Sequence, residues 1–304
     1  MCTHNAHGHR FVKRIPIWRR TAAAETVRGL TQGRKGSRLY ISTTRRLAAV
    51  DAANGRVLWE RDYGGHCCER MALSPDDRVI YAPAFGRAVW YVVDAATGKL
   101  LTTVSVIGWP RSTIHGPGNR AYLAAWESNR LLVLDTASNA IVKEVGPFTG
   151  SLCPFTLNRR GTLAFANVDG LVGFEVADVS TGLILDRVQV DDYPASDVAT
   201  YECPSHGIAF RPDETELGVA DGVGNQLRIF NATPYPPVEK TSMQLSRQPR
   251  WITFSLDGRY AYSSTGDVID ATTQTIVAVL KDEHGTVVES ERMVEIDRPS
   301  PSPM

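Results

Sequence analysis

Six residues of this 304-residue chain stand at matched positions and together could bind a small anion. Each precedes or begins a similar apolar stretch that returns about every forty residues, and the six are Arg28, Glu69, Arg111, Cys153, His206 and Arg250. Guanidinium groups that converge on one place repel one another unless an anion or a carboxylate lies between them. A ligand with a carboxylate or phosphate group would complement them through charge-assisted hydrogen bonds.

The binding part of this site is predicted to neutralise a carboxylate and thereby make a neighbouring C–H bond more acidic. The residues assigned to binding are Arg28, Arg111, Arg250, Trp251 and Cys153. Pro110 is the alternative to Arg111, because that copy of the repeat has a shorter turn.

Proton transfer is the catalytic step that such a site could perform. His206 would move the proton, Tyr201 is the second candidate, and Glu69 would act as partner acid or orienting group. This set predicts a lyase or isomerase acting on a small, carboxylate-bearing molecule. The alternative is a non-catalytic scaffold protein that binds a ligand or, through its loops, another protein.

A structural interpretation of the same charges also stands, because Glu69 with Arg28 and Arg111 could hold neighbouring repeats in register without a ligand. A divalent metal ion is the one cofactor considered, with His66, Glu202 and His206 as its ligands. No two of the histidines near this face, His66, His115 and His206, have the i, i+2 or i, i+4 spacing of a specific metal site.

The segment at residues 191–202 is about ten residues longer than the other junctions between repeats, and long loops in compact domains are often lids. It would lie over the same face as the six residues. Tyr193, Tyr201 and Glu202 could therefore reach a bound ligand.

A repeated unit of four short strands is predicted to position these residues. In the second copy the strands are expected over residues 70–73, 79–85, 88–94 and 99–106. The turn between the third and fourth strands is the clearest marker: an Asp that can bond its own backbone is followed by a residue able to adopt positive φ. It recurs as Asp51-Ala-Ala-Asn-Gly55, Asp94-Ala-Ala-Thr-Gly98, Asp135-Thr-Ala-Ser-Asn139, Asp178-Val-Ser-Thr-Gly182 and Asp270-Ala-Thr-Thr-Gln274.

Four-stranded units repeated at roughly 40 to 45 residues are typical of a β-propeller. We expect an all-β, seven-bladed propeller of four-stranded antiparallel blades. Six blades are counted over residues 25–282, and a strand at 289–297 with one at 10–18 would close the ring in a shared blade. The expected single domain is 10–297, with flexible ends at 1–9 and 298–304.

The second-strand segments resemble a known repeat. Tyr40-Ile-Ser-Thr-Thr44, Tyr81-Ala-Pro-Ala-Phe85, Tyr122-Leu-Ala-Ala-Trp126 and Tyr262-Ser-Ser-Thr-Gly266, each followed by a strand that ends in Asp, are similar to the YVTN-type repeat. The resemblance covers nearly the whole chain and implies a seven-bladed propeller of the quinoprotein-dehydrogenase-like group, in an uncharacterised bacterial subgroup. It implies no particular chemistry, because the family includes surface-layer proteins, binding scaffolds and lyases.

Composition excludes several classes of partner. Lys+Arg and Asp+Glu are equal at 33 each, so no overall field favours nucleic acid or an anionic membrane. No window approaches the roughly 18 apolar residues of a membrane span, and the first twenty residues lack the apolar core of a signal peptide. The five cysteines are expected to be free thiols, and with these features the chain is expected to be cytoplasmic.

Overall fold

The computed structural model describes residues 2–4, 8–17, 26–33, 37–64, 67–84, 86–190, 193–198 and 202–296. Within them the chain forms an all-β fold that contains six four-stranded antiparallel sheets, each made of strands consecutive in sequence. The first three sheets comprise β3 (Val27–Gln32), β4 (Arg38–Thr43), β5 (Arg46–Asp51) and β6 (Val57–Asp62); β7 (Ala72–Leu73), β8 (Val79–Pro83), β9 (Val89–Asp94) and β10 (Leu100–Ser105); and β11 (Trp109–His115), β12 (Arg120–Trp126), β13 (Leu131–Asp135) and β14 (Ala140–Val145).

The next three sheets follow the same order. They comprise β15 (Leu152–Leu157), β16 (Leu163–Val168), β17 (Gly173–Asp178) and β18 (Ile184–Gln189); β19 (Ser205–Phe210), β20 (Glu216–Asp221), β21 (Gln226–Asn231) and β22 (Val238–Gln244); and β23 (Ile252–Phe254), β24 (Tyr260–Ser263), β25 (Asp267–Asp270) and β26 (Thr275–Val279). The helix α1 (Ala195–Val198) lies between the fourth and fifth sheets in sequence. It is far too short to cross a membrane, and the described residues contain no other candidate span.

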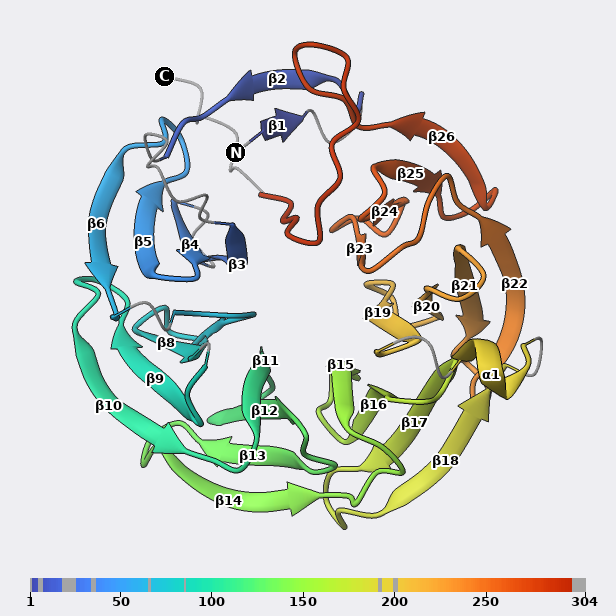
Figure 1. Ribbon diagram of the computed structural model, residues 1–304, viewed down its shortest axis with the longest axis horizontal. Coiled ribbons are helices and arrows are strands. Elements are labelled where there is room, and N and C mark those ends of the chain that lie inside the picture. Colours follow the sequence, from blue (N-terminus) through green and yellow to red (C-terminus); the bar gives the residue numbers. More distant parts are fainter. Residues whose placement is uncertain are drawn as a thin grey trace.

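The sheets are arranged around a common centre, as expected of a propeller-like fold (Figure 1). The first strand of a sheet is innermost and the fourth is outermost, as seen for β3 and β6 or for β15 and β18. Apolar residues on facing sheets pack together. For example, Tyr40 and Trp59 of the first sheet pack with Ile80 and Tyr91 of the second. Burial between sheets is the main stabilising term of such a repeat, because one sheet alone cannot cover its own faces.

The predicted Asp-led turns are confirmed. The side chains of Asp51, Asp94, Asp135, Asp178 and Asp270 each accept hydrogen bonds from backbone N–H groups two or three residues later. The last residue of each motif has positive φ, from 56° at Gln274 to 80° at Gly182. At Gly98 a side chain would also collide with the ring of Trp59, since an added Cβ would lie 2.6 Å from it. The same turn therefore shapes the hairpin and its contact with the preceding sheet.

Described segments near both ends of the chain lie between the sixth and first sheets (Figure 1), but the expected closing strand is absent from the described residues. The strand β2 (Phe11–Arg14) falls within the predicted range 10–18, yet it pairs with β1 (Cys2–His4), in the stretch expected to be flexible. Residues 289–296 form no strand; only an isolated bridge, Lys281 to Val287, precedes them. Seven complete blades therefore remain a prediction, and residues 297–304 lie outside the described part.

Residues 280–296 nevertheless connect the two neighbouring sheets. Val288 and Met293 pack against the core of the sixth sheet, whereas Val294 and Ile296 pack against that of the first. Arg14 of β2 forms ion pairs with Asp282 at 3.2 Å and Glu283 at 2.6 Å. The segment thus places its side chains between the inner ends of the first and last sheets.

The expectation of free thiols is wrong for four cysteines. Cys153 in β15 is bonded to Cys203, just before β19, with an S–S distance of 2.03 Å, and Cys67 is bonded to its neighbour Cys68. Sequence spacing gave no pairing, because Cys153 and Cys203 are 50 residues apart and adjacent strands bring them together. The expectation of a cytoplasmic location rested partly on free thiols, and the disulfides remove that argument, since stable disulfides are typical of oxidising compartments.

Intact-mass analysis of the denatured protein tests both disulfides. Alkylation after reduction should add four more groups than alkylation without reduction, because two disulfides yield four thiols. Variants Cys153→Ser and Cys67→Ser should each lower this difference by two groups. Equal labelling before and after reduction would contradict the pairing.

Candidate functional site

Irregular pairing of the innermost strands places the predicted residues on the axis. The register between first and second strands shifts at positions 27/29, 110/112, 152/155 and 205/208, and these shifts contain Arg28, Arg111, Cys153 and His206. A bulge turns a side chain out of the regular pleat and often lies beside functional sites. Four of the six repeat-matched residues therefore sit at the same kind of irregularity.

The other two residues, Glu69 and Arg250, stand before inner strands that start late. The strand β7 begins at Ala72 and β23 at Ile252. Glu69 is held by its N–H, which donates to the carbonyl of Pro83 at 3.0 Å. The N–H of Arg250 donates to the hydroxyl of Ser264 at 2.8 Å.

Two glycines allow adjacent sheets to approach closely at this level. A Cβ on Gly29 would lie 2.5 Å from the carbonyl oxygen of Glu69, and one on Gly207 would lie 2.6 Å from the Cα of Trp251. Each glycine follows a repeat-matched residue, Arg28 or His206. Close backbone approach therefore brings charged side chains from neighbouring sheets into one cluster.

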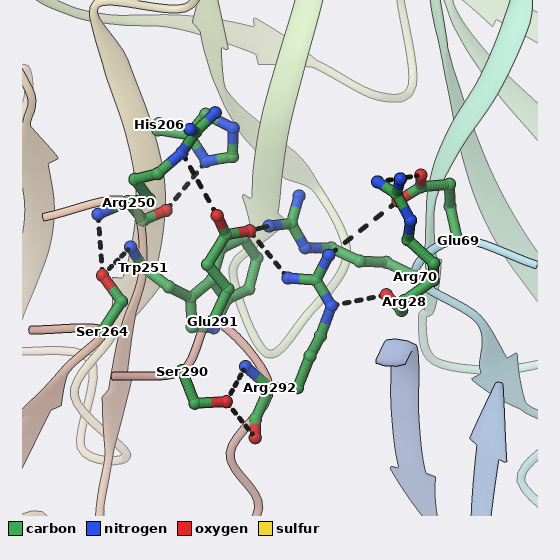
Figure 2. Close-up of polar contacts among 10 residues, drawn as sticks. All are labelled: Arg28, Glu69, Arg70, His206, Arg250, Trp251, Ser264, Ser290, Glu291 and Arg292. Carbon is green, nitrogen blue, oxygen red and sulfur yellow. Dashed lines mark hydrogen bonds and ion pairs between the residues drawn. The ribbon is translucent and has the colours of Figure 1, made fainter. Parts of the chain in front are cut away.

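Glu291 lies at the centre of this cluster and binds three guanidinium groups (Figure 2). Its Oε2 atom accepts from Arg70 at 2.8 Å and from Arg292 at 2.7 Å, and its Oε1 atom is 3.2 Å from the Nε of Arg250. Burial alone would raise the pKa of Glu291, but the hydrogen bond and charge of Arg292 and the charge of Arg70 lower it. The carboxylate is thus stabilised as an anion among the arginines.

A second carboxylate, Glu69, extends the network towards the first sheet. Its Oε1 atom is 3.4 Å from Arg28, and its Oε2 atom is 3.9 Å from the Nη2 atom of Arg292. Arg292 also donates from Nε to the carbonyl of Arg28. A lattice of Arg28 and Glu69 is therefore present, but Arg111 is not its third member.

One carboxylate of the cluster serves three guanidinium groups. Among the described residues, Glu291 contacts Arg70, Arg250 and Arg292, and Glu69 is shared by Arg28 and Arg292. The Arg70 side chain is 13% exposed, and its Nε atom is buried without a hydrogen-bond partner. Burial and the charge of Arg292 lower the pKa of Arg70. The Arg250 side chain is 57% exposed, so solvent reaches the cluster there.

Trp251, one of the residues assigned to binding, lies against Arg70. The guanidinium carbon of Arg70 lies 4.0 Å from the centroid of its ring, within the range of a cation–π interaction. The N–H of Trp251 donates to Ser264 at 3.1 Å, which fixes the backbone beneath the ring. Trp251 therefore orients Arg70 towards Glu291.

His206 is oriented by its contact with the next sheet. Its Nδ1 atom lies 2.8 Å from the carbonyl oxygen of Arg250, so Nδ1 carries the proton and donates. Burial and the positive charge of Arg70 lower the pKa of His206 to about 3, from an ordinary value of 6.5. The imidazole is therefore neutral at pH 7, with its lone pair on Nε2.

Arg111 belongs to a separate, more exposed pair. It forms an ion pair with Glu202 at 3.3 Å and lies over the ring of Trp126, 5.3 Å from its centroid. Glu202 thus reaches from the segment before β19 to the third sheet, as expected of a residue over this face. Because the pair is exposed, its contribution to stability is about 0–1 kcal/mol.

The other residues predicted for the site do not join the cluster around Glu291 in the described structure. Cys153 has no free thiol, because its sulfur is bonded to Cys203. Tyr201 and His66 lie outside the described residues. The hydroxyl of Tyr193 donates to Asp221 and accepts from the buried Arg228, both at 2.9 Å, so Tyr193 anchors the start of the segment before β19.

Across the described ranges, no three His, Cys, Asp or Glu side chains are grouped to share a metal ion.

Sequence reasoning missed Arg70, Glu291 and Arg292. Arg70 adjoins a predicted residue, and the late start of β7 brings both positions 69 and 70 to the axis. Glu291 and Arg292 fall in a segment predicted as a closing strand, outside the repeat alignment. The dense charges of residues 289–292 were the available signal, but a charged stretch usually indicates a solvated surface.

Comparisons with known proteins add no assignment: no protein-family model matches this chain, and a search of curated proteins gives no match. Membership of the YVTN-repeat family stays a prediction that rests on the repeat residues.

The pH dependence of stability tests the environment of His206. Its pKa is lower in the folded protein than in the unfolded chain, so the unfolded chain binds the extra proton between about pH 3 and pH 6.5. Stability should therefore fall as the pH drops from 7 to 4, by up to about 1.4 kcal/mol per pH unit from this group. The variant His206→Asn, which keeps a donor for the carbonyl of Arg250, should have a shallower slope.

Urea unfolding from pH 4 to pH 7 measures this difference. The exposed His284 provides the matched control, because His284→Asn should leave the slope of the wild type unchanged. Parallel curves for His206→Asn and the wild type would contradict a neutral, partly buried His206.

Proposed function

We propose that the axial cluster binds a small molecule through a carboxylate group. The observation that carries this proposal is the convergence of three guanidinium groups on the single carboxylate of Glu291: Arg70 precedes the second sheet, Arg250 precedes the sixth, and Arg292 belongs to the C-terminal segment. Like charges brought together at such a site cost folding free energy unless an anion compensates them. An anion from solution would supply further negative charge.

The distribution of solvent exposure supports the same proposal. Arg70 and Arg292 are mostly buried and fixed by Trp251, Glu69 and Glu291, whereas Arg250 is largely exposed. Fixed guanidinium groups lose little further entropy when a ligand binds, and buried ones interact with it at reduced dielectric screening. A carboxylate approaching from Arg250 would meet donors that are already oriented.

Acid–base catalysis on the bound anion is the second candidate function. It is favoured by the orientation of His206, because the bond from Nδ1 to Arg250 leaves Nε2 as an acceptor beside the arginines. A pKa of about 3 makes this nitrogen a weak base in the free protein. A bound carboxylate would raise that pKa, since a nearby negative charge stabilises imidazolium. Binding would therefore prepare the histidine for proton transfer, as in a lyase or isomerase.

Isothermal titration calorimetry with succinate tests the binding proposal. We expect Arg250→Gln to weaken binding by about ten-fold or more, equivalent to about 1.4 kcal/mol, because one charged donor is lost. Arg247→Gln is the matched control, since Arg247 is exposed and pairs with Glu289 outside the cluster. Equal affinities for Arg250→Gln and the wild type, or no binding by any of the proteins, would contradict an axial anion site.

Solvent deuterium exchange tests the catalytic candidate. In D₂O, the protein should speed the exchange of C–H protons next to a carboxylate in a panel of malate, citrate and 2-oxoglutarate, followed by NMR. His206→Asn should abolish the exchange and leave binding within about two-fold, since the histidine would move the proton without holding the anion. An exchange rate that survives this substitution would exclude His206 as the base.

A further inference from the structure

Glu291 is bound in the way that an anionic ligand would be bound. Both of its carboxylate oxygens contact guanidinium groups, which come from three separate positions: Arg70 before β7, Arg250 before β23 and Arg292 next in sequence. Figure 2 shows the carboxylate pointing into the space between these arginines, above Trp251. Charge-assisted contacts of this kind are those by which proteins recognise free carboxylates.

The segment that carries Glu291 lacks regular structure. Residues 289–296 form no strand, and the described backbone bonds near Glu291 include Ser290 N–H to Ser264 at 2.9 Å and Val288 N–H to Leu280 at 2.9 Å. The N–H of Arg292 is satisfied locally by the hydroxyl of Ser290 at 3.0 Å. Irregular segments with few backbone hydrogen bonds open at a lower free-energy cost than strands in a sheet.

Apolar contacts on both sides would guide the segment back after opening. Val288 and Met293 pack against the core of the sixth sheet, which contains Tyr260 and Val268. These contacts bracket Glu291 without involving its side chain. A local movement of residues 290–292 would therefore release the carboxylate and keep the flanking residues packed.

We propose that Glu291 is an internal substitute for the ligand, and that the carboxylate of an incoming molecule displaces it from Arg70, Arg250 and Arg292. This inference rests on the proposed anion-binding function. In the free protein Glu291 offsets part of the positive charge of the arginines, and the ligand takes over that role. Apparent affinity is then reduced by the fraction of molecules in which Glu291 occupies the site. A simple anion with few contacts competes poorly, so the site selects ligands that add contacts beyond one carboxylate.

Calorimetric titration with succinate tests this displacement in full-length variants. We expect Glu291→Gln to bind succinate at least about ten-fold more tightly than the wild type, because the competing charge is removed and the guanidinium groups remain. Glu289→Gln is the matched control: it carries the same change two residues away, on a side chain paired with Arg247 outside the cluster. Its affinity should equal that of the wild type.

The succinate affinities of the three proteins distinguish the displacement proposal from the anion-binding proposal. If the wild type binds succinate and Glu291→Gln binds it equally or more weakly, the displacement is wrong and the anion site stands. If none of the three proteins binds, the anion site itself is wrong, and the displacement falls with it.

Hydrogen exchange in the wild type gives a second test that needs no variant. Saturating succinate should speed the exchange of backbone amides in residues 288–292 several-fold, because the segment loses its contact with the arginines. Ligands usually slow exchange near their sites, so a faster rate is specific to displacement. Unchanged or slower exchange of these amides during succinate binding would overturn the inference.

Discussion

The carboxylate of Glu291 balances much of the charge at the centre of this protein. Arg70, Arg250 and Arg292 all contact it, and at an effective dielectric constant of 20, two unit charges about 5 Å apart interact by roughly 3 kcal/mol. Without this anion the three guanidinium groups would repel one another. Because they belong to the second sheet, the sixth sheet and the C-terminal segment, the same contacts join parts of the chain that are distant in sequence.

A repeated local feature makes this convergence available. The inner strand of several sheets is irregularly paired where it approaches the axis, and glycines next to Arg28 and His206 let neighbouring backbones come close. In a regular strand, alternate side chains would instead face the flanking sheets. Bulges and late strand starts therefore direct polar residues to the centre, and the intersheet cores remain apolar.

The electrostatics of the site connect binding with proton chemistry. His206 is neutral because burial and Arg70 disfavour its protonated form, and its Nδ1 proton is committed to the carbonyl of Arg250. A ligand carboxylate placed beside His206 would reverse part of that effect. The same cluster thus accounts for charge balance in the free protein and provides the physical basis for both proposed functions.

The repeating features could be predicted from the residues alone: the four-stranded sheets, their Asp-led turns, and the phase that placed Arg28, His206 and Arg250 near one axis. These features follow from local conformational propensity and from the repeat period, and both can be read from one amino-acid sequence. The features that do not repeat became visible only in the folded protein. The bond between Cys153 and Cys203, the irregular path of residues 280–296 and the position of Glu291 depend on contacts between segments far apart in the chain. No local spacing encodes such contacts, because they form only when segments far apart in the sequence fold side by side.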